Sequence, residues 1–321
     1  MKNYLLERKH QIELRLIPPV DPNLIQTELQ EGAEKIVTTP EKDGSLETYL
    51  IEPGRCPNTL KQIGRLREIM FDLTGGGTGT SCDLDQFDAL YCQIISWDPE
   101  EKEIVSGYRY ILGCDIKVEG NNVNSAVGKL FQFSPEFIQN KLLNGMELGR
   151  SFSNFFAKKG VFGLHVIFYG LAYLAKKYNF RYFFGKVTFY PLRMKENSFD
   201  SILYFLENQF PTEKKQAKAL KKYQTSTPPE IIESLNGERF DWDRGYGWNY
   251  QILRKKLKSL QERIEPLLKS YMNLSKELEV FDSVINEECG SVVEILIVMD
   301  MTTIDEIRIK QLTTCDLVLW F

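Results

Sequence analysis

The sequence is poor in histidine and has no closely spaced pair of cysteines. Its 321 residues include two histidines and six cysteines, and no CxxC motif occurs. A structural zinc site needs four such ligands at short spacing, so we predict no metal site. Scattered thiols in a chain of this length are typical of a protein in a reducing cytosol.

The sequence also lacks a long apolar run and an excess of positive charge. The longest apolar run, residues 161–175, is shorter than the ~20 residues that span a bilayer. Residues 1–16 are charged throughout and contain no apolar signal-peptide segment. A net charge of -4 argues against a nucleic-acid-binding protein, which would show a basic domain. We expect a cytoplasmic protein and leave open a peripheral contact with the inner membrane.

Hydrophobic periodicity predicts a mixed α/β core. Residues 60–73 repeat apolar side chains with the period of a helix, and two alternating segments about the turn DPEE indicate a β-hairpin. The elements we expect, in order, are a helix at 60–73, strands at 89–97, 103–112 and 145–153, a helix at 162–178 and a strand at 181–190. Strands that alternate with helices in this way favour a sheet flanked by helices.

The remaining segments are interpreted as additions to this core. Residues 1–50 form an N-terminal extension with a strand at 12–17 and a polar helix, and residues 51–321 form the main domain. Within that domain, 195–265 is lysine-rich and is predicted to be a helical insertion. Strands return after it, at 292–299 and 317–321.

A glycine-rich loop, GGGTGT, occupies positions 75–80. It lacks the GK[ST] ending of a P-loop and follows a predicted helix, whereas a P-loop follows a strand and opens a helix. We therefore expect a flexible lid or a turn, and not a nucleotide site.

Two charged motifs come next along the chain. The acidic turn DLDQFD at 83–88 can be a loop cap or a metal-like cluster, but it has neither the glycine nor the closing glutamate of an EF-hand. In the segment ELGR, Glu147 and Arg150 are three residues apart, so a regular strand would direct them to opposite faces. A bulge at Gly149 would bring both towards one site. A structural ion pair is the alternative.

Together these motifs resemble a known family. Its pattern is carried by Arg67-x-x-x-Phe71, by Asp85 and Asp88 around Phe87, by Gly107-Tyr108-Arg109, and by Glu147-Leu148-Gly149-Arg150. The order resembles the acyl-homoserine-lactone synthases and the long-chain N-acyl amino acid synthases. These are GNAT-fold enzymes that take acyl groups from acyl carrier protein.

A closer resemblance is to the bacterial haemolysin-like group, which includes ornithine-lipid and glycine-lipid (commendamide) N-acyltransferases. It is carried by the loop GGGTG ahead of DLDQFD, and by the segments WDPE at 97–100, SGYRYILG at 106–113 and PLLKSYM at 266–272. The pyrophosphate loop of acetyl-CoA-dependent GNAT enzymes has no clear counterpart, which disfavours acetyl-CoA as donor.

The resemblance implies a fold and a reaction. The fold is α/β (α+β), a GNAT-like mixed sheet flanked by helices, with the helical insertion before the C-terminal strands. The reaction is transfer of a long-chain (3-hydroxy)acyl group from acyl carrier protein to glycine, making an N-acyl amino acid lipid. Acyl-CoA is a second possible donor, and no cofactor is expected. The alternatives are ornithine as acceptor, a signal synthase of the acyl-homoserine-lactone type, and a lipid-binding or lytic protein.

The chemistry assigns roles to individual residues. An amine is mostly protonated near neutral pH, so attack on a thioester needs a base, for which Glu147 is the candidate. An amino-acid carboxylate suits an arginine fork, here Arg109 or Arg150. Asp85 and Asp88 would attract the ammonium group or orient those arginines. The resemblance adds Arg67 and Phe71 to the substrate-binding set.

Two further groups of residues are assigned to the donor. The aromatic side chains Phe152, Phe155 and Phe156 would line an acyl tunnel, with ordinary core packing as the alternative. A basic helix over 213–223 would dock the acidic carrier protein, because complementary charge speeds encounter. Its docking lysines would be Lys214, Lys218, Lys221 and Lys222, and a solvated helix face is the alternative.

Overall fold

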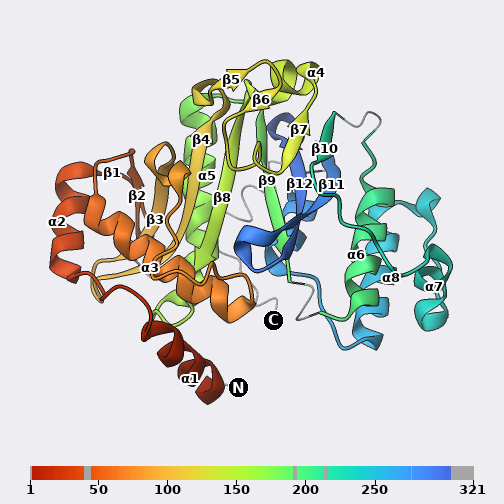
Figure 1. Cartoon of the computed structure of the whole chain (residues 1–321), viewed down its shortest axis with the longest axis horizontal. Helices are drawn as coiled ribbons and strands as arrows, with labels where there is room; N and C mark the ends of the chain where they lie inside the picture. Colours follow the sequence, from red (N-terminus) through yellow and green to blue (C-terminus); the bar gives the residue numbers. More distant parts are fainter. Residues whose placement is uncertain (1, 40–44, 191–193, 213–215, 276, 305–321) are drawn as a thin grey trace. The chain divides into compact units, whose positions relative to one another are not determined.

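The structure is a computed structural model, and it describes residues 2–39, 45–190, 194–212, 216–275 and 277–304. The chain forms two compact units, each assembled from separated segments. The described residues of unit 1 lie within 1–115 and 146–180, and those of unit 2 within 116–145 and 181–304. Figure 1 labels most of the helices and strands of both units.

Unit 1 contains an antiparallel sheet in the order β1-β2-β3-β4-β8. Its strands are β1 (Glu34–Thr38), β2 (Glu47–Ile51), β3 (Cys92–Asp98), β4 (Glu103–Leu112) and β8 (Gly145–Ser153). Its helices are α1 (Lys2–Glu13), α2 (Pro22–Gly32), α3 (Pro57–Thr74) and α5 (Gly163–Tyr178). Short 3-10 turns are η2 (Gln86–Ala89), η3 (Gly113–Asp115) and η5 (Gly160–Phe162). The predicted helix, hairpin, strand and helix of this part are confirmed, with shifts of a few residues at their ends.

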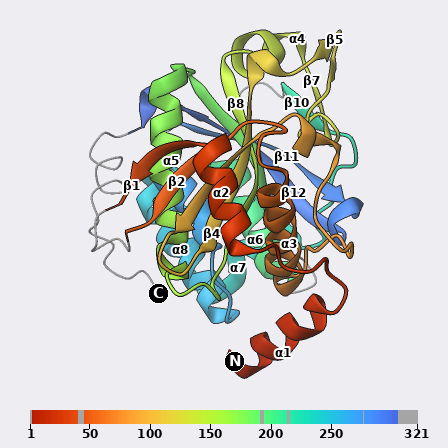
Figure 2. The same cartoon turned by 90° about the vertical axis from the view of Figure 1, so that its left-hand side faces the viewer.

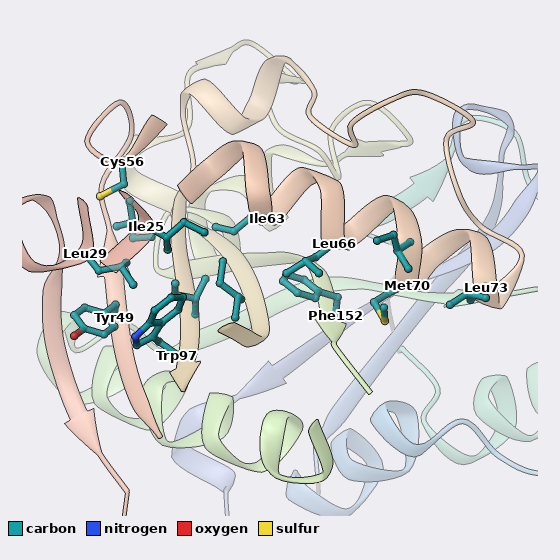
Figure 3. Packing of buried hydrophobic residues seen from close by; sticks show 14 of the residues in the cluster. Ile25, Leu29, Tyr49, Cys56, Ile63, Leu66, Met70, Leu73, Trp97 and Phe152 are labelled. Atoms are coloured by element: carbon teal, nitrogen blue, oxygen red, sulfur yellow. The ribbon is translucent and has the colours of Figure 1, made fainter. Parts of the chain in front are cut away.

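Alternation along the strands gives the sheet two apolar faces. On one face the strands contribute Tyr49 and Trp97 to a buried cluster with the apolar side of α3. Figure 3 shows these side chains together with Ile63, Leu66, Met70 and Leu73 of α3 and with Phe152 of β8. On the other face α5 packs so closely that a Cβ added at Gly170 would lie 2.1 Å from Cδ1 of Ile94.

The predicted strand at 12–17 is wrong. Residues Lys2–Glu13 are helical, and a turn follows (Figure 2). The helix packs on α3 through long-range pairs that the local sequence does not reveal, such as Arg8 to Asp72 at 2.9 Å and Arg65 to Glu13 at 2.9 Å. The predicted polar helix of the extension is α2. The proposed boundary at residue 50 stays a prediction, and β2 spans that position.

Unit 2 contains the antiparallel strands β9 (Tyr182–Phe189), β12 (Val292–Asp300) and β11 (Leu278–Asn286), in that order. Smaller pairings join β7 (Phe131–Phe133) to β10 (Ala217–Ala219), and β5 (Val118–Glu119) to β6 (Asn122–Val123). The helices are α4 (Pro135–Phe137), α6 (Glu196–Gln209), α7 (Pro229–Ser234), α8 (Gly245–Ser259) and α9 (Pro266–Leu274), with a π-helical turn η4 (Ile138–Leu142). The 3-10 turns are η7 (Leu235–Gly237), η8 (Trp242–Arg244), η9 (Glu287–Cys289) and η10 (Met301–Thr303).

In unit 2 the strands predicted at 181–190 and 292–299 are confirmed, and β11 was not foreseen. The predicted strand at 317–321 lies outside the described residues. The predicted helix over 213–223 is wrong where the structure describes it, because Ala217–Ala219 form β10. Pairing with β7 overrides the helical spacing of the lysines, and Ala217 is buried while Lys218 points to solvent.

Candidate active site

The acidic turn of unit 1 is a loop cap. The side chain of Asp85 accepts a hydrogen bond from the backbone N–H of Phe87 at 2.8 Å. Oδ2 of Asp88 in return accepts one from the N–H of Asp85 at 2.9 Å, which completes a capping box around η2. Of the two interpretations of this turn, the cap is confirmed for Asp85 and Asp88. Among the described residues no group of His, Cys, Asp and Glu is arranged to hold a metal ion.

Arg67 fastens this turn to α3. It is completely buried, and it donates to Oδ1 of Asp88 at 2.8 Å and to Oε1 of Gln93 at 2.6 Å. Burial raises the pKa of Asp88, but the charges of Arg67 and Arg109 outweigh that effect and hold it below its ordinary value. Asp88 is therefore ionised, and both of its carboxylate oxygens accept hydrogen bonds inside unit 1.

Arg109 of β4 also binds the turn. Its two terminal nitrogens donate to the two oxygens of Asp85 at 2.8 and 3.0 Å, and it lies 3.2 Å from Oδ2 of Asp88. The side chain of Arg109 is buried, whereas that of Asp85 keeps 28% of its surface exposed. Burial raises the pKa of Asp85, but Arg109, with help from Arg150, holds it well below its ordinary value.

The predicted bulge in β8 is confirmed. Gly107 pairs with Phe152 and Arg109 pairs with Gly149, so β8 has one extra residue in this interval. Arg150, and not Gly149, takes the left-handed backbone conformation, with φ at 53°. The neighbouring Gly107 is required by packing, because a Cβ there would lie 2.6 Å from the ring of Phe152.

The bulge directs Arg150 towards the acidic turn. Its guanidinium lies 3.3 Å from Oδ2 of Asp83 and 3.5 Å from Oδ2 of Asp85, and 5.8 Å from the ring centre of Phe71. These contacts are longer than those of Arg109, and 18% of the side chain is exposed. Asp83 is buried, and burial raises its pKa despite the nearby charge of Arg150.

Glu147 joins the same cluster through a tyrosine. Its side chain is 1% exposed, and its Oε1 accepts a hydrogen bond from the hydroxyl of Tyr91 at 2.8 Å. The guanidinium of Arg109 lies over the ring of Tyr91, 5.1 Å from its centre. Glu147 is thereby connected to the arginines and the acidic turn.

The structure thus brings together seven of the predicted site residues, which are Arg67, Phe71, Asp85, Asp88, Arg109, Glu147 and Arg150. Sequence reasoning did not assign Tyr91, Gln93 or Asp83 to the site. Tyr91 follows Asp88 at the same three-residue spacing that separates Asp85 from Asp88. Gln93 lies opposite Arg109 in the hairpin, so the register would have revealed it.

The glycine-rich loop is a turn wrapped around one of the chain's own carboxylates. Glu68 of α3 accepts hydrogen bonds from the N–H of Thr78 at 3.0 Å and of Gly79 at 2.8 Å, and from the hydroxyl of Thr78 at 2.7 Å. Arg15 adds an ion pair to Glu68 at 2.9 Å and donates to the carbonyl of Thr80. The backbone N–H groups of the loop therefore bind an anion, and that anion is the carboxylate of Glu68.

The three phenylalanines assigned to an acyl tunnel have different surroundings. Phe152 is buried in the cluster beneath α3, and Phe156 packs against that cluster with Nζ of Lys9 4.8 Å from its ring centre. Phe155 is 49% exposed, and its ring lies 5.0 Å from that of Phe156. A tunnel formed by these side chains stays a prediction.

The lysines assigned to carrier docking belong to unit 2. Lys218 is exposed on β10, Lys221 forms an ion pair with Glu287, and Lys222 forms one with Asp282 at 2.9 Å. Lys214 lies outside the described residues. Docking by these lysines stays a prediction.

Comparison with known proteins places the site within a family. A model of the acetyltransferase (GNAT) domain matches residues 66–155, the interval that contains all seven residues. A glycine N(alpha)-acyltransferase from Bacteroides thetaiotaomicron is 36% identical over 312 residues, which cover 93% of this chain and 90% of that protein. One from Phocaeicola vulgatus is 36% identical over 290 residues, 87% of this chain and 86% of that protein. No solved structure matches. The chain therefore belongs to the GNAT N-acyltransferases, in the group that contains these glycine N(alpha)-acyltransferases.

Proposed function

We propose that this acyltransferase moves a long-chain (3-hydroxy)acyl group from acyl carrier protein to the amine of glycine, forming an N-acyl amino acid lipid. The observation that carries the proposal is the identity, over most of both chains, to two proteins named glycine N(alpha)-acyltransferase. The pair formed by Asp85 and Arg150 supports the acceptor, because it presents opposite charges at a partly exposed edge of the site.

The acceptor would bind across that pair. Glycine is a zwitterion, so its carboxylate would bind the guanidinium of Arg150 while its amine approaches Asp85. The contact of 3.5 Å between Arg150 and Asp85 is long for a hydrogen bond, and exchanging it for substrate contacts costs little. Both terminal nitrogens of Arg109 already donate to Asp85. Arg109 would therefore not bind the acceptor itself, and its role would be to hold Asp85 ionised.

The reaction needs a proton acceptor near the amine. In the step we propose, Glu147 takes a proton from the acceptor ammonium, and the freed nitrogen attacks the thioester carbonyl carbon. The nitrogen of the tetrahedral intermediate then loses a second proton to solvent, the C–S bond breaks, and Glu147 returns its proton to the leaving thiolate. Glu147 ends as it began, and the products are an amide and the free thiol of the carrier.

The donor would be acyl carrier protein, which is strongly acidic. Lys221 and Lys222 are paired with acids, so we assign first contact to Lys218, which is exposed on β10. Reversing Lys218, Lys221 and Lys222 to Glu should raise KM for acyl carrier protein substrate. The same variant should turn over a short acyl-pantetheine thioester normally. Equal losses with both donors would contradict docking at these lysines.

The reaction is tested with purified enzyme, acyl carrier protein loaded with a 3-hydroxyacyl group, and glycine, with products identified by mass spectrometry. We expect N-acylglycine, and we expect Glu147→Gln to lower kcat on the order of 10²–10⁴-fold at an unchanged melting temperature. Parallel reactions replace glycine by ornithine or by S-adenosylmethionine, and the carrier by coenzyme A. An acyl product with ornithine alone would contradict glycine, and full kcat in Glu147→Gln would contradict the base.

Peripheral contact with the inner membrane stays a prediction. Among the helices within the described ranges, none combines the length and apolarity needed to cross a bilayer. An acylated amino acid is a surfactant, so a lytic effect expected of a haemolysin-like protein would come from the product and would need no lytic segment in the protein.

A further inference from the structure

Tyr91 extends the acidic turn towards Glu147. Asp85, Asp88 and Tyr91 follow one another at three-residue intervals, from the N-cap of η2 to two residues beyond its end. The backbone N–H of Tyr91 donates to the carbonyl of Phe87 at 2.9 Å, which fixes the end of the turn. The segment that carries the two aspartates thus also sets the position of Tyr91.

The ring of Tyr91 is held on two sides. Arg109 lies over it with its guanidinium carbon 5.1 Å from the ring centre, and the ring of Phe87 meets it at 5.9 Å and an angle of 63°. Tyr91 is 1% exposed. A ring confined in this way holds its hydroxyl oxygen in a fixed place, and in this structure that oxygen lies 2.8 Å from Oε1 of Glu147, to which it donates.

We propose that Tyr91 is a positioning residue for the acyl transfer, acting through Glu147. Its hydrogen bond selects one orientation of the Glu147 carboxylate and stabilises the ionised form that must accept the proton. The inference rests on the proposed function, because it needs Glu147 to be the base. It also gives the Arg109 network a catalytic consequence, since Arg109 orients the ring that orients the carboxylate.

A purely structural role for Tyr91 predicts an effect on stability and none on the reaction. Any buried tyrosine hydroxyl needs a hydrogen-bond partner, so its removal can lower stability without touching the reaction. Tyr49 provides a matched control in the same unit. It is buried, and its hydroxyl donates to Oε2 of Glu47 at 2.7 Å, yet neither residue belongs to the charged cluster.

The test compares Tyr91→Phe with Tyr49→Phe by thermal melting and by the pH dependence of kcat/KM. For Tyr91→Phe we expect kcat to fall about tenfold. Losing a donor to the carboxylate raises the pKa of the base, so the acid limb of the profile should move up by about one pH unit. Tyr49→Phe should leave kcat and the acid limb of the profile unchanged. An unshifted acid limb and normal kcat in Tyr91→Phe would overturn the proposal.

The double variant Tyr91→Phe, Glu147→Gln separates the role of Tyr91 from the proposal on which it depends, that Glu147 is the base. If Tyr91 acts through Glu147, the double variant should be no slower than Glu147→Gln alone. A much slower double variant would show that Tyr91 acts independently, against the proposal. If Glu147→Gln is fully active, the base assignment fails and the role of Tyr91 fails with it. If Glu147→Gln is inactive while Tyr91→Phe behaves like the wild type, only the role of Tyr91 is refuted.

Discussion

Arg109 donates to both oxygens of Asp85, at 2.8 and 3.0 Å, so the arginine fork that best suits a substrate carboxylate already holds one from the chain itself. Arg150 reaches the same aspartate only at 3.5 Å, from a side chain that is partly exposed. Two arginines that look equivalent in the sequence therefore have different surroundings. Arg109 is buried within the cluster, whereas the side chain of Arg150 keeps 18% of its surface exposed.

Lysine substitution should separate the two arginines. Lysine keeps the charge but cannot form a planar fork. We expect Arg109→Lys to lower the free energy of unfolding by about 1–3 kcal/mol, because it breaks a buried bidentate pair. Arg150→Lys should raise KM for glycine about tenfold with little change in stability. Urea unfolding and steady-state kinetics measure these effects, and a normal melt with a raised glycine KM in Arg109→Lys would contradict the assignment.

The backbone of Arg150 gives a second prediction. Its φ of 53° lies in the left-handed region, which costs a residue with a Cβ about 1 kcal/mol more than glycine. Arg150→Gly and Arg150→Ala both remove the guanidinium, so they differ chiefly in this backbone cost. We expect the glycine variant to be more stable than the alanine variant by about 1 kcal/mol. An alanine variant of equal or greater stability in urea titrations would show that the bulge is not strained.

The Glu68 carboxylate should control order in the glycine-rich loop. In Glu68→Gln one oxygen becomes an amide donor, so the N–H groups of Thr78 and Gly79 lose part of their acceptor. We expect hydrogen exchange at these amides to accelerate about tenfold. Glu28→Gln is the control, since Glu28 accepts from the N–H groups of Asn58 and Thr59 at the start of α3. Unchanged exchange in Glu68→Gln would mean that packing alone holds the loop.

Much of the core and of the site could be predicted because their signals are local. The hairpin of β3 and β4 shows in strand alternation about a polar turn, and the bulge follows from the need to direct Glu147 and Arg150 to one cluster. The identity of the strained residue did not follow. Glycine is the usual occupant of a left-handed position, yet the structure has Arg150 there beside Gly149.

The features that escaped prediction depend on distant partners. Lys2–Glu13 has almost no amphipathic pattern, and its packing on α3 rests on pairs such as Arg8 with Asp72, 64 positions apart. Ala217–Ala219 is a strand because β7 lies beside it, although the lysines of the surrounding segment 213–223 have helical spacing in the sequence. Tyr91 is linked to Glu147 across 56 positions, and no local signal encodes that hydrogen bond.

The ionised acidic turn should make stability depend on pH. Asp85 and Asp88 have lowered pKa values, so their stabilisation is complete above the ordinary carboxyl pKa and is lost progressively as pH falls from that value to their lowered values. Asp83 has a raised pKa, so its contribution has the opposite sign and decreases as pH rises. With two lowered pKa values against one raised value, we expect unit 1 to lose stability as the pH falls below about 5, and the loss to continue below the ordinary carboxyl pKa towards the lowered values of Asp85 and Asp88.

Asp85→Asn tests this dependence. The variant should be less stable than the wild type at pH 7 by about 1–2 kcal/mol, because Arg109 loses its ionised partner. The difference should shrink as pH falls, since protonation of Asp85 produces the same loss in the wild type. Asp115→Asn, at an exposed position of the same unit, should follow the wild type at every pH. Parallel curves for Asp85→Asn and wild type in urea titrations from pH 7 to pH 3 would show that the charge of Asp85 does not stabilise the site.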